Sequence, residues 1–600
     1  MNRHELIERL KGFEWNDVEF KEALNACPKS AYETVSAFAN TSGGWLVFGV
    51  KEQDDKFEII GVKKVTKVET EFLSTLHQQG KISCPLDVEP SFVEYNSAIA
   101  LVFFIPEVRR EDKPVYLNGN IRSSYIRRGS GDHKCTEEEI KTFLREASVK
   151  TYDTELIDID YRSCFEEDSI RWYRNTWQRR NPNRLEAASD TEFLQHFGLL
   201  MDTGEKTLPT RAALLLFGKE STIMQISPRP IIDFRRLNSG YDEVLPEQRY
   251  DDRDLMECNL IVAWRRILEL YQKTAEIPFK FDSETLERDD KPVDYTAFRE
   301  ATINLLTHQD FGDHTRKASI QMFKDRLIFW NPGASFVSKD EMFQPGEKPF
   351  RNPQVAGMFR RIGFGEQAGT GINAIYSNWR ILKRVPPVIE NNKSYHSFCL
   401  TLLKEELVSD EQILFQAKLG VNLSEEESAV FAQVWRTGQI RLLEARAISG
   451  FSIANTKKLL NRLTVQNLIE PKEGQKQTHY ILAEHLREIK TEILKDDVSE
   501  KKMLTLSSAQ VKPLKGISDI QRKIIDFSDS PHPITQIMTH VGVKNRTFFR
   551  KNHLDPLLEN GILKMSYPDK PKHPKQAYVL TEIGFELKSR FTKKDKGNKE

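Results

Sequence analysis

Several features that are common in other protein classes are missing from this sequence. No Cys-x-x-Cys pair occurs, which argues against a disulfide framework and against the usual zinc modules. No apolar run approaches the roughly 18 residues that cross a bilayer, and no secretory leader pattern opens the chain. We therefore expect a cytoplasmic protein with no membrane contact and reduced thiols, which are Cys27, Cys84, Cys135, Cys164, Cys258 and Cys399.

Net charge is also missing, because 88 Lys and Arg residues balance 88 Asp and Glu residues. The whole-chain charge therefore gives no reason to expect a polyanionic partner, and only local clusters of charge can do so. Apolar residues make up 39% and charged residues 29% of the chain, as in ordinary folded proteins. A length of 600 residues predicts roughly three to five domains.

Residues 1–148 are predicted to form an α/β module. The apolar run Trp45–Val50 follows a Gly-Gly turn and indicates a buried strand. Two further strands are expected at Ala98–Pro106 and Ser124–Arg128. Thr136 with Glu139 has the spacing of a capping box, so a helix is expected to begin there.

Short motifs in this module follow one another in a recognisable order. They are Glu14-x4-Glu19-Phe20-Lys21, Ser36-Ala37-Phe38-Ala39-Asn40-Thr41-x-Gly43-Gly44, Gly49-Val50 and Tyr125-Ile126-Arg127-Arg128-Gly129-Ser130. The series resembles the AlbA-like domain shared with Schlafen proteins and covers about 130 residues. The resemblance implies a domain that binds nucleic acid.

The same resemblance implies a metal-dependent nuclease site in some members of the family. Its metal ligands fall on Glu14 and Glu19, the third acid on Glu52, and Lys21 lies in the same cluster. Such carboxylates bind Mg²⁺ or Mn²⁺, which activates water and stabilises charge on a phosphate. The family more often has Asp at the third position. The alternative is that Glu19 and Lys21 form a structural ion pair and that Glu14 lies in a solvated loop.

Residues 149–405 are expected to form a second α/β domain. The apolar run Leu208–Gly218 is interpreted as a helix leading into a strand, and Arg229–Arg236 as another strand. Downstream, a helix is predicted around Phe298–Phe311, followed by a hairpin with a turn at Lys324–Arg326. Four-residue spacing places three polar side chains on one face of that helix, namely Glu300, Asn304 and His308.

This order is similar to a divergent GHKL-type domain, a relation of the gyrase and histidine-kinase ATP fold. The resemblance implies that Glu300 is a base for water and Asn304 a Mg²⁺ ligand, with His308 on the same face. It also implies that Gly369 and Gly371 bind the phosphates of ATP at a helix start. The Asp-x-Gly-x-Gly element of that fold is replaced here by Asn331-Pro332-Gly333. The alternative is a satisfied polar network that holds the helix to the sheet.

Residues 422–485 are predicted to form a winged helix-turn-helix. Helices are expected at Glu425–Arg436, Ile440–Ile448 and Ile453–Gln466, with Ser452 as an N-cap, and a hairpin wing follows. The third helix carries Lys457, Lys458 and Arg462, residue types that contact phosphates and base edges. The many acidic residues of this unit leave protein docking as the alternative.

A second unit at 515–585 repeats this order after a charged linker at 486–514, and a polar tail at 586–600 ends the chain. Its helices are expected at Ser518–Phe527, Pro533–Val541 and Lys544–Asn560, and its wing at Ile562–Leu580. We predict that it binds DNA through a basic surface, which comprises Lys544, Asn545, Arg546, Arg550, Lys551 and Lys572.

The sequence thus predicts a multidomain α/β plus α+β protein, with a Schlafen-type AlbA-like domain, a GHKL-like middle domain and C-terminal winged helices. This combination resembles the RecG-related DNA-binding family and its transcriptional regulators. The favoured hypothesis is a DNA-binding regulator gated by ATP. The alternatives are a defence-type nuclease that cleaves RNA or DNA, and an assembly scaffold built on homo-oligomers.

Overall fold

The structure is a computed structural model and divides into two compact units, residues 1–483 and 484–600. It describes residues 6, 10, 16–53, 56–148, 150–182, 189–243, 250–273, 275, 292–344, 346–364, 371–472, 478–487, 489–490, 519–543, 549–554, 557–558, 562–566, 576–581 and 588. Within them, no helix is long and apolar enough to span a membrane.

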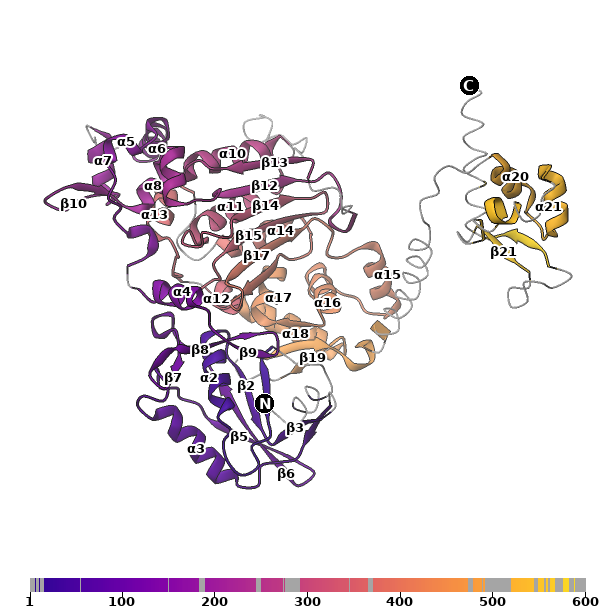
Figure 1. The fold of residues 1–600 in the computed structure, drawn as a ribbon, viewed down its shortest axis with the longest axis horizontal. Coiled ribbons are helices and arrows are strands. Elements are labelled where there is room, and N and C mark those ends of the chain that lie inside the picture. The colour runs from indigo at the N-terminus through magenta and orange to yellow at the C-terminus, as the bar shows by residue number, and fades with distance from the viewer. Residues whose placement is uncertain are drawn as a thin grey trace. The chain divides into compact units, whose positions relative to one another are not determined.

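The N-terminal part of the first unit is built on a sheet in the order β1-β2-β6-β5 (Figure 1). Its strands are β1 (Val18–Lys21), β2 (Gly44–Phe48), β5 (Pro90–Tyr95) and β6 (Ala98–Ile105). Smaller sheets comprise β3 (Val50–Gln53) with β4 (Lys56–Ile59), and β7 (Tyr116–Leu117) with β8 (Asn120–Arg128) and β9 (Gly131–Lys134). The helices are α2 (Ser30–Asn40), α3 (Val65–His77), η1 (Arg110–Asp112) and α4 (Glu137–Ala147).

Two local features of this part depend on particular residues. The predicted strand at Trp45–Val50 is in fact two strands, because Gly49 adopts a φ of +92° and its position leaves no space for a side chain beside Gly61. The predicted capping box at the start of α4 is confirmed, since the hydroxyl of Thr136 accepts from Glu139 N and the Glu139 carboxylate accepts from Thr136 N.

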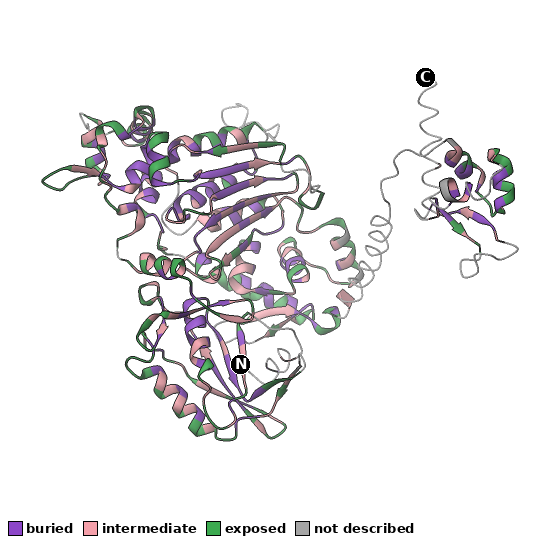
Figure 2. Ribbon diagram, in the orientation of Figure 1, coloured by how far each residue is buried: buried purple, intermediate pink, exposed green. Residues whose placement is uncertain are grey.

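The middle part is built on a mixed sheet of six described strands in the order β13-β12-β14-β15-β17-β16. These are β12 (Ile232–Arg236), β13 (Asp252–Met256), β14 (Ala318–Met322), β15 (Arg326–Pro332), β16 (Val388–Asn392) and β17 (Ser397–Leu403). The hairpin predicted at Lys324–Arg326 is confirmed as the β14–β15 connection. Figure 2 shows that buried residues concentrate on this sheet and on the helices packed against it.

Several helices pack around this sheet. They are η2 (Tyr152–Thr154), α5 (Tyr161–Cys164), α6 (Glu167–Arg180), α7 (Asp190–His196), α8 (Arg211–Phe217), α9 (Glu220–Ile226), η3 (Tyr241–Glu243), α10 (Leu260–Gln272), α11 (Tyr295–His308), α12 (Lys339–Phe343), α13 (Pro353–Arg361) and α14 (Gly371–Ile381). The prediction for Leu208–Gly218 is wrong in its order. The short strand β11 (Thr207–Pro209), which pairs with β10 (Leu200–Asp202), comes first, and Thr210 then caps the buried helix α8.

The last part of the first unit contains α15 (Asp410–Lys418), α16 (Glu425–Thr437), α17 (Leu442–Ser449) and α18 (Ile453–Val465). A sheet in the order β18-β20-β19 joins β18 (Gln439–Arg441), β19 (Ile469–Lys472) and β20 (His479–Leu482). The helix predicted from Ile440 begins later, because residues 439–441 pair with β20 as a strand. Ser452 is confirmed as the N-cap of α18.

In the second unit, the described elements are α20 (Asp519–Phe527), α21 (Ile534–Val541), the π-helical segment η4 (Arg550–Leu554), β21 (Leu563–Met565) and β22 (Tyr578–Leu580). β21 and β22 pair antiparallel. Apolar side chains from all five elements form one small core, which includes Ile537, Phe549 and Leu563. The order of elements agrees with the prediction where residues are described.

Candidate functional site

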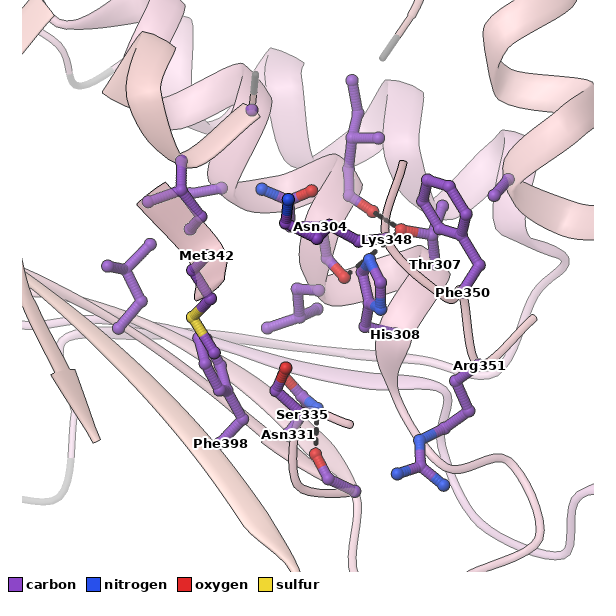
Figure 3. Close-up of a pocket in the computed structure, with 18 of the residues that line it drawn as sticks. Asn304, Thr307, His308, Asn331, Ser335, Met342, Lys348, Phe350, Arg351 and Phe398 are labelled. Atoms are coloured by element: carbon purple, nitrogen blue, oxygen red, sulfur yellow. Dashed lines mark hydrogen bonds between the residues drawn. The ribbon is translucent and has the colours of Figure 1, made fainter. Parts of the chain in front are cut away.

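A cavity of about 140 Å³ lies in the middle domain, against one face of α11 (Figure 3). Glu300, Asn304 and His308 all line it, so the common helix face expected from their spacing is confirmed. Glu300 is 5% exposed, and its Oε1 accepts from Arg299 Nη2 at 2.9 Å. The opposite wall comes from the end of β15 and from β17. The cavity therefore presents a row of polar groups on an otherwise apolar helix.

The first residue of α14 closes this row. A Cβ atom at Gly371 would lie 3.3 Å from Asn304 Nδ2 and 3.5 Å from Glu300 Oε2. The first distance is shorter than most contacts of a Cβ atom, and the second is an ordinary van der Waals contact. Because residue 371 is glycine, the first turn of α14 can lie close to both side chains. Gly369, the other predicted phosphate-binding glycine, lies outside the described residues. The structure thus brings together four of the five predicted nucleotide-binding residues.

The side chain of His308 is uncharged near neutral pH. Burial, together with the neighbouring positive charge of Arg351, lowers its pKa to about 4. Its ring stacks on Phe350 with centroids 5.0 Å apart and planes at 23°. His308 can therefore offer the cavity a neutral hydrogen-bonding ring and not a cation.

The Asn331-Pro332-Gly333 sequence lies at the end of β15 and lines the cavity through Asn331 and Gly333. The Asn331 amide donates to Pro332 O at 3.1 Å and Gly333 O at 3.3 Å, which fixes the turn. Gly333 has a φ of +100°, and a Cβ there would lie 2.8 Å from Arg351 Nε. Glycine is required at this position on both grounds.

The cavity is also lined by three cationic side chains that were not among the predicted nucleotide-binding residues, namely Lys348, Arg351 and Arg360. Lys348 Nζ donates to Gln344 O at 2.8 Å and to Gly346 O at 3.1 Å. Lys348 and Arg351 lie in the segment before α13, which has no periodic pattern, and Arg360 lies in the last turn of α13. A surplus of basic residues on a short loop is a weak signal, since such residues are usually solvated.

The acids predicted for a nuclease are arranged differently. Both Glu19 oxygens have cationic partners, since Oε1 lies 2.6 Å from Lys21 Nζ and Oε2 lies 2.8 Å from Arg127 Nη1. Arg127 is 3% exposed and also pairs with Asp132. Glu52 is exposed on β3, and Glu14 lies outside the described residues. The geometry therefore favours the structural ion pair for Glu19, while a nuclease role stays a prediction.

The Ser-x-x-x-Asn part of the N-terminal motif has a structural role. Asn40 Nδ2 donates to the carbonyls of Val115 and Tyr125, each at 2.9 Å, and Val115 N donates back to Asn40 Oδ1. Ser36 Oγ donates to Val115 O at 2.7 Å and accepts from Tyr125 N. These buried bonds tie α2 to β8 and to the segment before β7.

The predicted DNA-binding residues of the first unit lie on the exposed face of α18. Lys457 and Lys458 are exposed, and within the described part of the chain neither has an ion pair. Arg462 is also exposed but pairs with the buried Glu427, its Nη1 lying 3.0 Å from Oε1. In the second unit only Arg550 has a described side chain, and it is half-buried. The others, Lys544, Asn545, Arg546, Lys551 and Lys572, lie outside the described side chains.

A buried cluster that sequence patterns did not indicate joins α4 to the middle domain. Glu146, Asp310 and His396 place potential metal-ligating atoms within 4.8 Å of one another. Among the described residues, this is the group of three that could hold a metal ion. However, Arg351 pairs with Glu146 and Arg145 pairs with Asp310. Both carboxylates are thus already neutralised by protein cations, and the cluster is an ion-pair network.

Comparison with known protein families gives four matches along the chain. The model described as "Schlafen, AlbA_2" matches residues 14–136, and a domain of unknown function, DUF8451, matches residues 141–233. The family described as "Putative ATP-dependent DNA helicase recG C-terminal" matches residues 316–402. The family described as "Filamentation induced by cAMP protein Fic-like, C-terminal domain" matches residues 520–581. No curated protein matches the sequence.

Three solved structures are similar to parts of the chain. The DIP2311 protein from Corynebacterium diphtheriae is 17% identical over 79% of this chain and 93% of its own, with a TM-score of 0.37. The N-terminal domain of the "Putative ATP-dependent DNA Helicase RecG-related Protein" from Nitrosomonas europaea is 28% identical over 22% of this chain and 92% of its own, with a TM-score of 0.18. A Fic family protein from Desulfovibrio desulfuricans is 16% identical over 30% of this chain and 58% of its own, with a TM-score of 0.11.

The family matches carry the assignment, and they agree with the resemblance seen in the sequence motifs. The chain is a mixed α/β multidomain protein with a Schlafen AlbA_2-type domain near its N-terminus and a middle domain similar to the ATPase-like domain of the matching recG C-terminal model.

Proposed function

We propose that this chain is a DNA-binding regulator that responds to ATP bound with Mg²⁺ in the middle domain. The observation that carries the proposal is that Glu300, Asn304, His308 and Gly371 line the same cavity. The family that matches residues 316–402 supports both the ATP part and the DNA part of this proposal, because its description names an ATP-dependent DNA helicase.

The residues of the cavity fit magnesium and a phosphate chain. The Asn304 amide oxygen is of the hard oxygen type that Mg²⁺ takes from proteins, and the ion would neutralise phosphate charge. Gly371 begins an 11-residue helix, whose first N–H groups and dipole favour an anion. Its missing Cβ leaves room beside Asn304 and Glu300. Glu300, buried in the same row, is the group placed to accept a proton from water.

We infer that α16, α17 and α18 with β18–β20 form a winged helix. The module has the order helix, strand, two helices and hairpin, and Gly450 forms the turn between α17 and α18 with a φ of +73°. Leu443 and Ala447 of α17 pack against the core of the middle domain. The exposed cations Lys457 and Lys458 of α18 are therefore available to phosphates.

The same order in the second unit supports a second winged helix there, although its predicted basic residues lie mostly outside the described side chains. Residues 520–581 also match the Fic-like C-terminal family. The nuclease remains the main alternative function, and its weakness is that Glu19 is already paired with Lys21 and Arg127. An assembly scaffold is the third.

Isothermal titration of the full chain with Mg²⁺ and a non-hydrolysable ATP analogue tests the nucleotide site. Binding is expected for the wild type and for Asn373→Ala, which changes a residue of α14 outside the cavity lining. Asn304→Ala is expected to lose most of the affinity. Equal binding by all three proteins, or none by the wild type, would reject the proposed site.

The DNA half is tested by a gel shift with duplex DNA at two salt concentrations. Binding that falls steeply with salt is expected, because phosphate contacts release counterions. Metal-dependent cutting that Glu19→Gln abolishes would instead favour the nuclease. Association without any shift of DNA would favour the scaffold.

A further inference from the structure

One wall of the cavity is held by a residue of the N-terminal domain. Phe336 lines the cavity, and two guanidinium groups contact its ring, that of Arg110 at 4.9 Å and that of Arg351 at 4.5 Å from the ring centroid. Arg110 belongs to η1, which is part of the N-terminal domain. A cation over an aromatic face contributes about 0.5–2 kcal/mol. The N-terminal domain therefore touches the cavity wall through one aromatic ring.

Arg351 makes a second connection between the same two parts. Its Nη2 donates to Ala334 O at 2.8 Å, which holds the segment after β15, and its Nη1 pairs with Glu146 of α4. Arg351 is 7% exposed. Although burial alone would raise the pKa of Glu146, the charges of Arg351 and His396 outweigh it and hold that pKa at about 2. Glu146 is therefore ionised, and Arg351 joins the cavity wall to α4 by a buried ion pair.

Asp310 makes a third connection between the two domains. It lies two residues after the end of α11, and its backbone N donates to Pro332 O at 2.7 Å. Its carboxylate pairs with Arg145 of α4 and lies 3.3 Å from His396 Nε2. The end of α11 and the end of β15 are thus both fastened to adjacent residues of α4.

A further ion pair bridges the same two domains. Lys393 Nζ, in the turn between β16 and β17, lies 2.6 Å from both oxygens of Glu107, which precedes η1. Lys393 does not line the cavity, so this ion pair holds the two domains together without contacting the cavity wall.

We propose that Arg351 is a positioning residue that couples the cavity to the N-terminal domain, so that nucleotide binding and the docking of α4 stabilise each other. The inference rests on the proposed nucleotide site. Arg351 and Phe336 hold the wall in the shape that lines the cavity, so removing their N-terminal partners weakens binding. Because coupling between two sites is reciprocal, bound nucleotide must in turn protect α4.

The test combines titration calorimetry with hydrogen exchange on the full chain, using Mg²⁺ and the non-hydrolysable ATP analogue. Glu146→Gln removes the charge that pairs with Arg351. Independently, Arg110→Gln removes the one of the two cations over Phe336 that the N-terminal domain supplies. Glu138→Gln is the matched control, because Glu138 is an exposed residue of the same helix. Melting temperatures show that each variant is folded.

In the wild type and in Glu138→Gln, the analogue is expected to slow hydrogen exchange in α4 and η1. Glu146→Gln and Arg110→Gln are each expected to bind the analogue roughly five- to tenfold more weakly, and to lose the protection of α4. Tight binding without protection of α4 in the wild type would overturn the coupling alone. Affinities in both variants equal to the control would do the same, whereas no binding to the wild type would overturn the proposed function and the coupling with it.

Discussion

The acids of the N-terminal domain and the polar row of the middle domain differ in how far their hydrogen bonds are already satisfied. Both Glu19 oxygens are taken by Lys21 and Arg127 within the protein. In Glu300, Oε1 accepts from Arg299, whereas Oε2 lies beside the open position at Gly371. A matched motif therefore indicates a ligand site only where its polar atoms are left facing a cavity, and the middle domain meets that condition.

The largest effect is expected from filling the space beside Gly371. Gly371→Val places a branched side chain within contact distance of Asn304 and Glu300, where the phosphates are proposed to bind. We expect the affinity for the ATP analogue to fall roughly 100-fold, or about 2.7 kcal/mol. Ala374→Val, one turn further along α14 and outside the cavity lining, is the control. Similar affinities of the two variants in calorimetry would show that the start of α14 is not in the site.

The second effect concerns stability and is expected from Glu19→Gln. Arg127 would keep Asp132 but lose one charged partner while staying buried, which costs about 2 kcal/mol. Glu52→Gln should change stability by less than about 0.5 kcal/mol, because Glu52 is exposed. Melting curves of the full chain measure both. A nuclease role for Glu19 would gain support if Glu19→Gln abolished cleavage with its melting temperature unchanged.

Local patterns predicted the local structure well. The helix that carries Glu300 and Asn304, the hairpin at Lys324–Arg326 and the caps at Thr136 and Ser452 depend on short spacing and turn chemistry. The prediction failed at residues 208–218 because Thr207–Pro209 form a short hairpin with the neighbouring strand β10. It failed at residues 439–441 because they pair with β20, which lies much farther along the chain. Strand pairing of that kind depends on tertiary contacts, which override local preference.

The partners of the site residues could not be predicted in the same way. Arg127 reaches Glu19 across 108 positions of the chain, and Arg351 reaches Glu146 across 205. No spacing rule connects residues so far apart, and a single charged residue on a loop gives no periodic signal. The polar row of α11 could be found because one helix carries all of it, whereas the network that positions its cavity is assembled from separate segments.

A third effect separates paired from unpaired cations on α18. Replacing Lys457 and Lys458 together by Ala is expected to weaken DNA binding about tenfold at low salt and to reduce the salt slope by about 2. Arg462→Ala is expected to do less, because Glu427 already pairs with Arg462. Lys206→Ala is the control, since Lys206 is an exposed lysine of the middle domain that pairs with Asp158. Binding isotherms at several salt concentrations give both quantities, and equal slopes for all variants would remove α18 from the interface.

The smallest effect is a difference in the pH dependence of two histidines. Burial and the nearby charge of Arg351 would both lower the pKa of His396. The carboxylates of Glu146 and Asp310 outweigh these two effects and raise that pKa above its usual value. Arg145 faces the same cluster through Asp310. The stabilisation from His396 is therefore complete below about pH 6.5, its unfolded value, and is lost as pH rises through the raised pKa.

His308 has the opposite sign, because its folded pKa of about 4 lies below the unfolded value. Its burial costs stability as pH falls from about 6.5 toward 4, since the unfolded chain then binds the extra proton. The loss of stability caused by His396→Gln, relative to the wild type, should therefore be largest in weakly acidic solution. The loss caused by His308→Gln should be smallest there. Melting temperatures of the full chain between pH 5 and 8 measure this difference, because the two curves should diverge toward acid. Parallel curves would mean that the α4 cluster and the cavity do not hold their histidines in opposite charge states.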